Sequence, residues 1–274
     1  MRNNSCKSFF SLEEQRWYIA NDSARGPWSK EACHAGPVTG TIARELELLV
    51  TDKQLLRLTV ELLKPVPMAG FEITTEFRKQ GRMVTTAAAT LKDKNGVVVA
   101  VAFSLHAQEL EVGELPSTKV ESPSFEASLP GDFPIVQAKH DLPFITNGIE
   151  VRYPPEENNG TGPTCIWMKA LPLLETEQPS PFQQLCPLAD CGNGISRNME
   201  VNEANFMNPD ITIVMYRKPE SIWLASRARS FWEPTGLGLA EAVLFDTQGS
   251  IGSVAQTLLI QRTKVPREAA QSSS

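Results

Sequence analysis

The 274-residue chain lacks several features that would assign it at once to a large class of proteins. It has no run that approaches the ~18–20 apolar residues of a membrane-spanning helix. Positive charge is also scarce: 26 Lys and Arg stand against 32 Asp and Glu, which gives a formal net charge of -6. Because nucleic-acid recognition normally needs a basic surface, we expect neither a membrane span nor a nucleic-acid partner.

The chain also lacks recognisable targeting segments. Residues 1–10 contain no apolar core of the length that a signal peptide needs, and the last residues, 271–274, are not a peroxisomal address. The five cysteines are an odd number in a long chain, which indicates reduced and mostly buried thiols. We therefore expect a cytoplasmic protein. Cys186 and Cys191 have no second Cys/His pair to complete a zinc site, so we expect no metal.

Several catalytic motifs are missing too. There is no Gly-x-Ser-x-Gly, no Walker motif and no Gly-x-Gly-x-x-Gly, so serine hydrolase and dinucleotide chemistry have no support, and we expect no cofactor. Histidine is rare. His34 begins a predicted helix, where it either caps the helix or lines a pocket, and we interpret His106 and His140 as structural or solvated.

Hydrophobic residues make up 41% of the chain, and their spacing predicts an α+β protein. The first half contains a helix whose apolar residues repeat from Val38 to Leu49, preceded by a strand at 8–20. Four strands follow, at 57–64, 71–77, 83–91 and 97–105. The second half has strands at 144–153 and 164–170, a helix that starts at Ser180, and strands at 211–218, 221–229, 239–245 and 250–261. Residues 111–138 lose periodicity, and we predict a connection that packs along the surface.

The two halves resemble each other. The interval from Thr59 to Asp93 equals that from Thr212 to Asp246, and both pairs lie 153 residues apart. In each half a strand with a central Thr is followed, after the same interval, by an Asp-x-x-Gly turn. We interpret this agreement as an internal duplication.

The segment 180–194 carries the first candidate for chemistry. Ser180 and Gln183 have the spacing of a capping box, and Pro187 should kink or restart the helix just ahead of Asp190. Asp190 lies at the edge of the apolar stripe formed by Phe182, Leu185, Cys186 and Ala189. The carboxylate is therefore either a partly buried base or a group that points to water at the end of the helix.

Two amides complete the candidate set. Gln256 interrupts an apolar strand, where it faces either the interior or solvent, and Asn208 belongs to a turn-forming Asn-Pro-Asp sequence. At the offset of 153, Phe103 stands opposite Gln256 and Pro37 opposite Asp190, so the first half lacks both groups. A carboxylate can take a proton from water while two amides fix the direction of that water.

The chain resembles the acyl-CoA thioesterase II-like family, the double hotdog thioesterases. The residues that carry the resemblance are 28–36, 58–67, 179–194, 208–213 and 246–259. It implies a tandem, or double, hotdog fold, in which each module is a long helix wrapped by a curved antiparallel sheet. The corresponding division is an N-terminal module at 1–110, the connection at 111–138, a C-terminal module with the catalytic residues at 139–263, and a frayed tail at 264–274.

The resemblance also implies an activity, which is hydrolysis of acyl-CoA to a fatty acid and CoA by a directly activated water. Asp190 and Gln256 match the family's catalytic Asp and Gln, and Asn208 stands where well-known members carry Thr. Gly36, His34 and Gly192 are the positions that we predict to contact substrate. The alternative is a non-catalytic double hotdog that binds acyl-CoA or a protein partner. Family members often form homo-oligomers.

Overall fold

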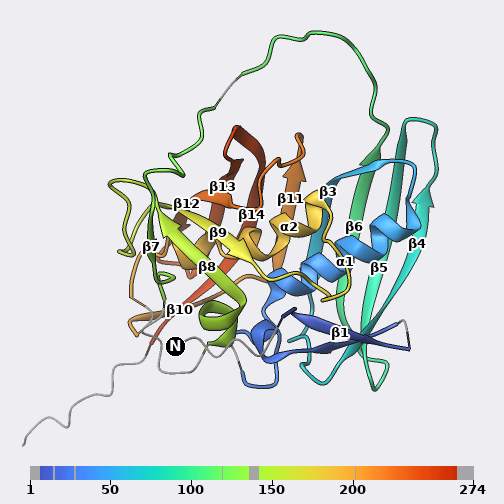
Figure 1. Ribbon diagram of the computed structural model, residues 1–274. Coiled ribbons are helices and arrows are strands. Elements are labelled where there is room, and N and C mark those ends of the chain that lie inside the picture. Colours follow the sequence, from blue (N-terminus) through green and yellow to red (C-terminus); the bar gives the residue numbers. More distant parts are fainter. Residues whose placement is uncertain are drawn as a thin grey trace, which may run out of the picture.

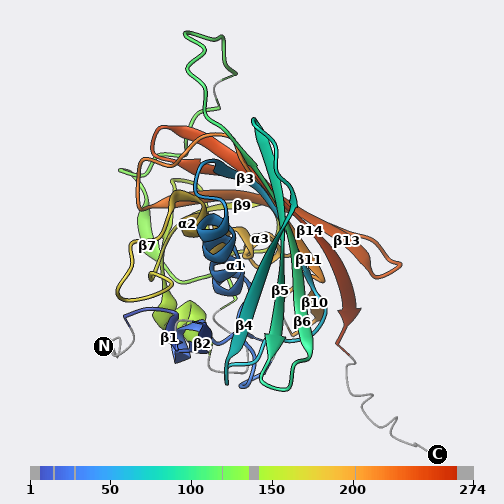
Figure 2. The ribbon, with the colours of Figure 1, turned by 90° about the vertical axis from the view of Figure 1, so that its right-hand side faces the viewer.

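A single mostly antiparallel sheet wraps around two helices. The computed structural model describes residues 7–14, 16–27, 29–118, 120–135, 142–200 and 202–263. Within these residues the sheet has 14 strands, in the order β1-β2-β4-β5-β6-β3-β11-β14-β13-β12-β9-β8-β7, with β10 paired to β14. Figures 1 and 2 show the sheet curving around α1 and α2. No helix among these residues is long and apolar enough to cross a membrane.

The first half follows the predicted order of elements. Its elements are β1 (Phe10–Glu13), β2 (Trp17–Ala20), η1 (Asp22–Ala24), α1 (Ala35–Leu49), β3 (Gln54–Leu62), β4 (Phe71–Lys79), β5 (Val84–Asp93) and β6 (Val98–Ala107). The helix and the four strands after it are confirmed. The single strand predicted at 8–20 is wrong, because β1 and β2 form a hairpin in that region.

The second half contains β7 (Leu129–Gly131), the π-helical turn η2 (Phe144–Gly148), β8 (Ile149–Tyr153), β9 (Thr164–Ala170), α2 (Pro181–Ala189), α3 (Gly192–Ile195), β10 (Ala204–Met207), β11 (Asp210–Met215), β12 (Leu224–Trp232), β13 (Leu237–Asp246) and β14 (Gly249–Arg262). The predicted strand at 144–153 is wrong in its first part, which is helical. The short strand β10 was not predicted.

The two halves meet where β3 pairs antiparallel with β11. Thr59 lies opposite Thr212 in this ladder, and their hydroxyl oxygens are 3.1 Å apart. These are the residues that the offset of 153 relates in the sequence. The strands β3 and β11, which occupy equivalent positions in the two repeats, therefore pair with each other. The sheet continues through this pair from one half to the other.

The helices α1 and α2 run antiparallel inside the sheet. Gly36 at the start of α1 lies against Pro187 near the end of α2, whereas Glu47 near the end of α1 contacts Ser180 before the start of α2. A Cβ atom on Gly36 would come within 2.9 Å of the Pro187 Cα atom. The small residues at the start of α1 therefore allow a second backbone to approach closely.

Residues 120–135 of the connection pack on the second half of the molecule, whereas residues 111–118 are exposed. The Phe125 ring lies edge-on against Trp167 at 5.2 Å, and Ser122 donates its hydroxyl to the Asp246 carbonyl. The preceding residues leave β6 in a long excursion, drawn in green at the top of Figure 1. Cys6, Trp28, His140 and the tail 264–274, which the sequence analysis also interprets, lie outside the described residues.

Candidate active site

The carboxylate of Asp190 is buried at the end of α2. Ser180 caps the start of this helix by accepting the Gln183 N–H at 3.1 Å, and Asp190 is its C-cap. The Asp190 side chain is only 5% exposed, so the alternative that it points to water is wrong. Of the kink or restart predicted at Pro187, the restart ahead of Asp190 is wrong, because α2 continues through Pro187 to Ala189 and the chain becomes helical again only at Gly192.

The two predicted amides converge on this carboxylate. Asn208, between β10 and β11, donates from Nδ2 to Asp190 Oδ1 at 2.9 Å. Gln256, on β14, donates from Nε2 to the same oxygen at 3.0 Å. Two hydrogen bonds to one oxygen hold the Asp190 carboxylate in a fixed position.

The remaining amide oxygen of Gln256 has no partner among the described residues. Gln256 faces the interior with 2% of its surface exposed, and its Oε1 atom is buried without a hydrogen bond. The amide group of Gln256 cannot be flipped, because its oxygen would then face the carboxylate oxygen, and both atoms are hydrogen-bond acceptors. Gly192 lies beside this oxygen: a Cβ atom there would be 3.0 Å from Oε1. An unpaired buried acceptor costs about 1–3 kcal/mol, and such groups are often kept for function.

His34 reaches the same carboxylate from the first half of the chain. It caps α1, and its Nδ1 atom accepts the Gly36 N–H at 3.1 Å. The same nitrogen lies 3.1 Å from Asp190 Oδ2. The imidazole stacks on Phe144, with ring centroids 3.8 Å apart. His34 therefore both caps the helix and lines the pocket, which the sequence had left as alternatives.

The structure changes the comparison between the halves. In the ladders, Thr59 pairs with Phe103 and Thr212 with Ala255, so Ser104 and not Phe103 corresponds to Gln256. Phe103 faces outward and is 40% exposed. The helix caps His34 and Ser180 are 146 residues apart. Aligned on these caps, Arg44 and not Pro37 corresponds to Asp190. The offset of 153 does not relate the helices of the two halves, because the segment between α2 and β11 is longer than the segment between α1 and β3.

A pocket of about 50 Å³ opens beside these groups. Its polar lining includes His34, Asp190 and Asn208. The other lining residues are mainly apolar: Pro27, Ala35, Phe133, Ile135, Leu142, Phe144, Ile145, Cys191, Gly194 and Phe206, together with Arg25. Burial and the Asp190 charge raise the pKa of the Cys191 thiol well above its ordinary value, so this cysteine is not a nucleophile.

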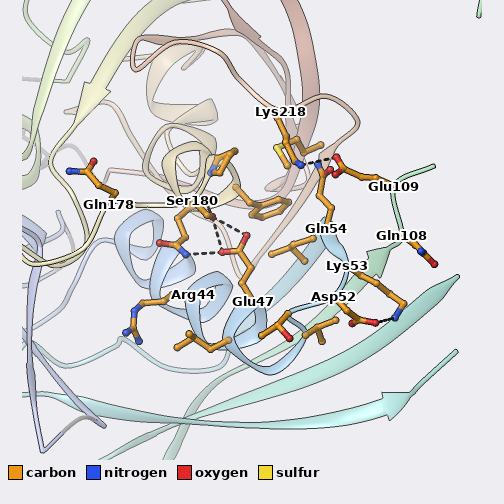
Figure 3. Close-up of a pocket in the computed structure, with 18 of the residues that line it drawn as sticks. Arg44, Glu47, Asp52, Lys53, Gln54, Gln108, Glu109, Gln178, Ser180 and Lys218 are labelled. Atoms are coloured by element: carbon orange, nitrogen blue, oxygen red, sulfur yellow. Dashed lines mark hydrogen bonds and ion pairs between the residues drawn. The ribbon is translucent and has the colours of Figure 1, made fainter. Parts of the chain in front are cut away.

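A much larger pocket, of about 690 Å³, lies at the other end of the helix pair (Figure 3). One of its carboxylates, Glu47, accepts hydrogen bonds from Ser180 and Gln183 at 2.7 Å. Its cations are paired within the chain, for example Lys218 with Glu109. We place the candidate site at the smaller pocket, because only there does a buried carboxylate adjoin a buried acceptor without a partner.

Sequence reasoning missed two parts of this arrangement. Phe144 supports the His34 ring, but its segment was predicted to be a strand; Pro143 and the Asn147-Gly148 pair could have signalled the turn that forms instead. Gln183 was expected to bond back to Ser180, yet its side chain bonds Glu47. Only the Ser180 half of the capping box is confirmed.

Comparisons with known proteins identify the family of the chain. The family model for the acyl-CoA thioesterase C-terminal domain matches residues 121–260, and that for the N-terminal domain matches residues 24–106. No curated protein matches the chain.

Among similar solved structures are three proteins of between 14% and 16% identity. A putative thioesterase II from Thermobifida fusca has a TM-score of 0.70 and 15% identity, over 96% of this chain and 98% of its own. A protein with a hotdog fold from Alicyclobacillus acidocaldarius has a TM-score of 0.68 and 16% identity, over 93% and 96%. An acyl-CoA thioesterase II from Mycobacterium marinum has a TM-score of 0.62 and 14% identity, over 94% and 97%. At these identities the likeness establishes the hotdog fold alone.

Proposed function

The chain belongs to the acyl-CoA thioesterase family, and from this premise we propose that it hydrolyses acyl-CoA to a free fatty acid and CoA. Asp190 is the general base that activates water for direct attack on the thioester. Gln256 and Asn208 are the amides that hold the carboxylate and direct the water. Neither a covalent intermediate nor a cofactor takes part in this mechanism.

The observation that carries the proposal is the unpartnered Oε1 atom of Gln256 beside the Asp190 carboxylate. A water that attacks a carbonyl through one lone pair has two O–H groups to donate. Oδ1 of Asp190 already accepts two amide bonds, so Oδ2 and Gln256 Oε1 remain as the two acceptors. Two fixed acceptors orient the water and lower the entropic part of the barrier.

The reaction balances within this set of groups. As the water oxygen bonds to the carbonyl carbon, one water proton passes to Asp190 Oδ2 and the other stays on the new hydroxyl. When the tetrahedral intermediate collapses, the carbon–sulfur bond breaks and CoA leaves as the thiolate. The proton held by Asp190 then returns to the sulfur or to solvent, and the free acid remains. General base catalysis of this kind contributes about 10²–10⁴-fold in rate.

The proposed fold is two hotdog modules in tandem, at 1–110 and 139–263. Pairing of Thr59 with Thr212, and separate family models for the two halves, support this division. The proposed site then draws on both modules, because His34 belongs to the first and the other polar groups to the second. The four described cysteines are buried free thiols, which suits the reducing cytoplasm as the proposed compartment.

The test is release of thiol from a panel of acyl-CoA substrates of increasing chain length. We expect turnover by the wild type and a loss of about 10²–10⁴-fold in kcat for Asp190→Asn, which keeps the shape of the side chain but cannot accept the proton. Asp190→Ala serves as a second variant, and circular dichroism checks that both fold. Equal release by the wild type and both variants would remove Asp190 from the mechanism. No release from any chain length would favour a module that binds acyl-CoA without turnover.

A further inference from the structure

The hydrogen bond at the start of α1 determines which nitrogen of His34 carries the proton. Nδ1 accepts the Gly36 N–H with the geometry of a hydrogen bond. The contact of Nδ1 with Asp190 Oδ2 is defined by distance alone. A nitrogen that accepts a hydrogen bond carries no proton, so the ring proton lies on Nε2.

The Nε2–H group is free to bind a ligand. No described residue bonds Nε2, whereas Nδ1 has its partner on the backbone. The His34 side chain is 14% exposed and lines the same pocket as Asp190 and Asn208. Stacking on Phe144 fixes the plane of the ring, and the capping bond fixes its rotation. The donor is therefore held in one direction before any ligand arrives.

We propose that His34 donates its Nε2–H to the thioester carbonyl oxygen and stabilises the oxyanion of the tetrahedral intermediate. This proposal rests on the proposed function and adds a residue from the first half of the chain to it. Asp190 and His34 both line the pocket, and in this arrangement the attacking water contacts the carboxylate while the carbonyl oxygen contacts the imidazole. A donor oriented in advance needs no rearrangement when charge develops, which is the basis of oxyanion stabilisation.

The first experiment separates this role from the capping role of His34. Asn is among the best N-cap residues, so His34→Asn keeps an acceptor for the start of α1 but lacks a donor that reaches as far as Nε2. We expect kcat to fall about 10²–10³-fold, as for loss of one oxyanion donor, with little change in KM or in thermal stability. His34→Ala, which removes the cap as well, should lose the same activity and also stability. A His34→Asn enzyme with wild-type kcat would overturn the proposal.

The second experiment reads the tautomer directly and does not depend on activity. The chain has three histidines, so ¹⁵N-histidine labelling gives few imidazole signals, and the His34→Asn variant assigns one of them. We expect the ¹⁵N shifts of a neutral ring protonated at Nε2. A proton on Nδ1 would overturn the proposal, because His34 would then pair with Asp190 and its Nε2 would act as an acceptor.

The two experiments also distinguish failure of this inference from failure of the proposed function. If the wild type hydrolyses acyl-CoA and Asp190→Asn does not, the function stands, and a fully active His34→Asn removes only the oxyanion role. If the wild type hydrolyses no thioester, the function and the oxyanion role both fall, and the ¹⁵N shifts still decide the tautomer.

Discussion

The two ends of the helix pair hold a carboxylate in different ways. At the Asp190 end, two amides converge on one oxygen, and a buried amide oxygen stays without a partner. At the Glu47 end, Ser180 and Gln183 satisfy the carboxylate, and both groups belong to the first turn of α2 or its cap (Figure 3). At the Asp190 end an acceptor remains for a ligand to bond, whereas at the Glu47 end the hydrogen bonds join α1 to α2.

The size of a pocket does not reveal this difference. The Glu47 pocket is more than ten times as large as the Asp190 pocket, at about 690 Å³ against about 50 Å³. Yet its Lys and Arg side chains are already paired with carboxylates, Arg44 with Glu177, Lys53 with Asp52 and Lys218 with Glu109. In the small pocket a few directed polar groups meet apolar walls, which is the usual composition of a ligand site. In this protein, a buried polar atom without a hydrogen bond is therefore a better indication of the reactive site than the volume of a pocket.

Among the variants that test this difference between the two ends, the largest effect should come from a methyl group placed where the proposed water binds. In Gly192→Ala the new Cβ atom would lie 3.0 Å from Gln256 Oε1, and its only other neighbour within 4 Å is Ala240 Cβ at 3.8 Å. The residue is helical, so alanine suits the backbone. We expect kcat to fall by about 10- to 100-fold, within the range for a displaced catalytic water, while thermal stability is kept. Steady-state kinetics and a melting curve measure the two quantities.

Gly194→Ala is the matched control on the same short helix. Its Cβ atom would meet the Phe133 ring at 3.3 Å and not Gln256. A methyl group there narrows the apolar wall of the pocket, so we expect KM to rise more than kcat falls. If both variants lowered kcat equally, the effect would come from α3 as a whole and not from a water at Gln256.

A smaller effect, on stability, should follow from Gly36→Ala. The added Cβ atom would lie 2.9 Å from Pro187 Cα and 3.1 Å from the Cys186 carbonyl oxygen, and neither backbone atom can move alone. Overpacking of this kind costs about 1–3 kcal/mol, which denaturant unfolding can measure. On the same helix, the three atoms nearest to the new Cβ of Gly40→Ala would all belong to the side chain of Leu173, which can rotate away. An equal loss of stability in both variants would contradict a specific contact between the helices.

The Glu47 end contains a group that should make stability depend on pH. His106, buried on β6 opposite Leu55 of the large pocket, has its pKa lowered to about 4 by burial. A lowered pKa means that the folded state disfavours the charged ring, so the stability present above pH 6.5 is lost as the pH falls toward 4. We expect a loss on the order of 3 kcal/mol over this window, absent from His106→Leu. Leucine is chosen because Leu258 occupies the position in β14 that corresponds to His106 in β6. If the free energy of unfolding changed with pH in the same way in the wild type and in His106→Leu, the contribution of His106 would be refuted.

Patterns within single elements predicted much of the fold. Strand alternation, the Asp-x-x-Gly turns and the Ser180 cap each depend on neighbours a few residues away, and the structure agrees with them. The same local pattern singled out Asp190. The exception is the segment at Phe144, where apolar residues favoured a strand and contacts with the rest of the protein favour a helical turn.

The parts that the sequence left open depend on contacts between distant segments. Whether Gln256 faces inward is set by the register of β14, and a shift of one residue would turn it outward. His34 and Asp190 come from opposite halves, and only the antiparallel packing of α1 on α2 brings them together. Likewise, the Gln183 side chain donates a hydrogen bond to Glu47 of the other helix and not to the backbone of Ser180, as a capping box would require. No local spacing contains this information.

The smallest expected effect concerns Glu47 itself. Burial raises the pKa of its carboxyl, and the bonds from Gln183 and Ser180 only partly oppose this. A raised pKa means that the folded state favours the neutral acid, so its contribution to stability is complete below the ordinary value of 4.5 and is lost as the pH rises through the folded-state value. The free energy of unfolding of the wild type should therefore decline with rising pH relative to that of Glu47→Gln, opposite in sign to the His106 effect. Because Glu47 lies far from Asp190, kcat should not change; a Glu47→Gln variant with reduced kcat would show that the two ends of the helix pair do not act separately.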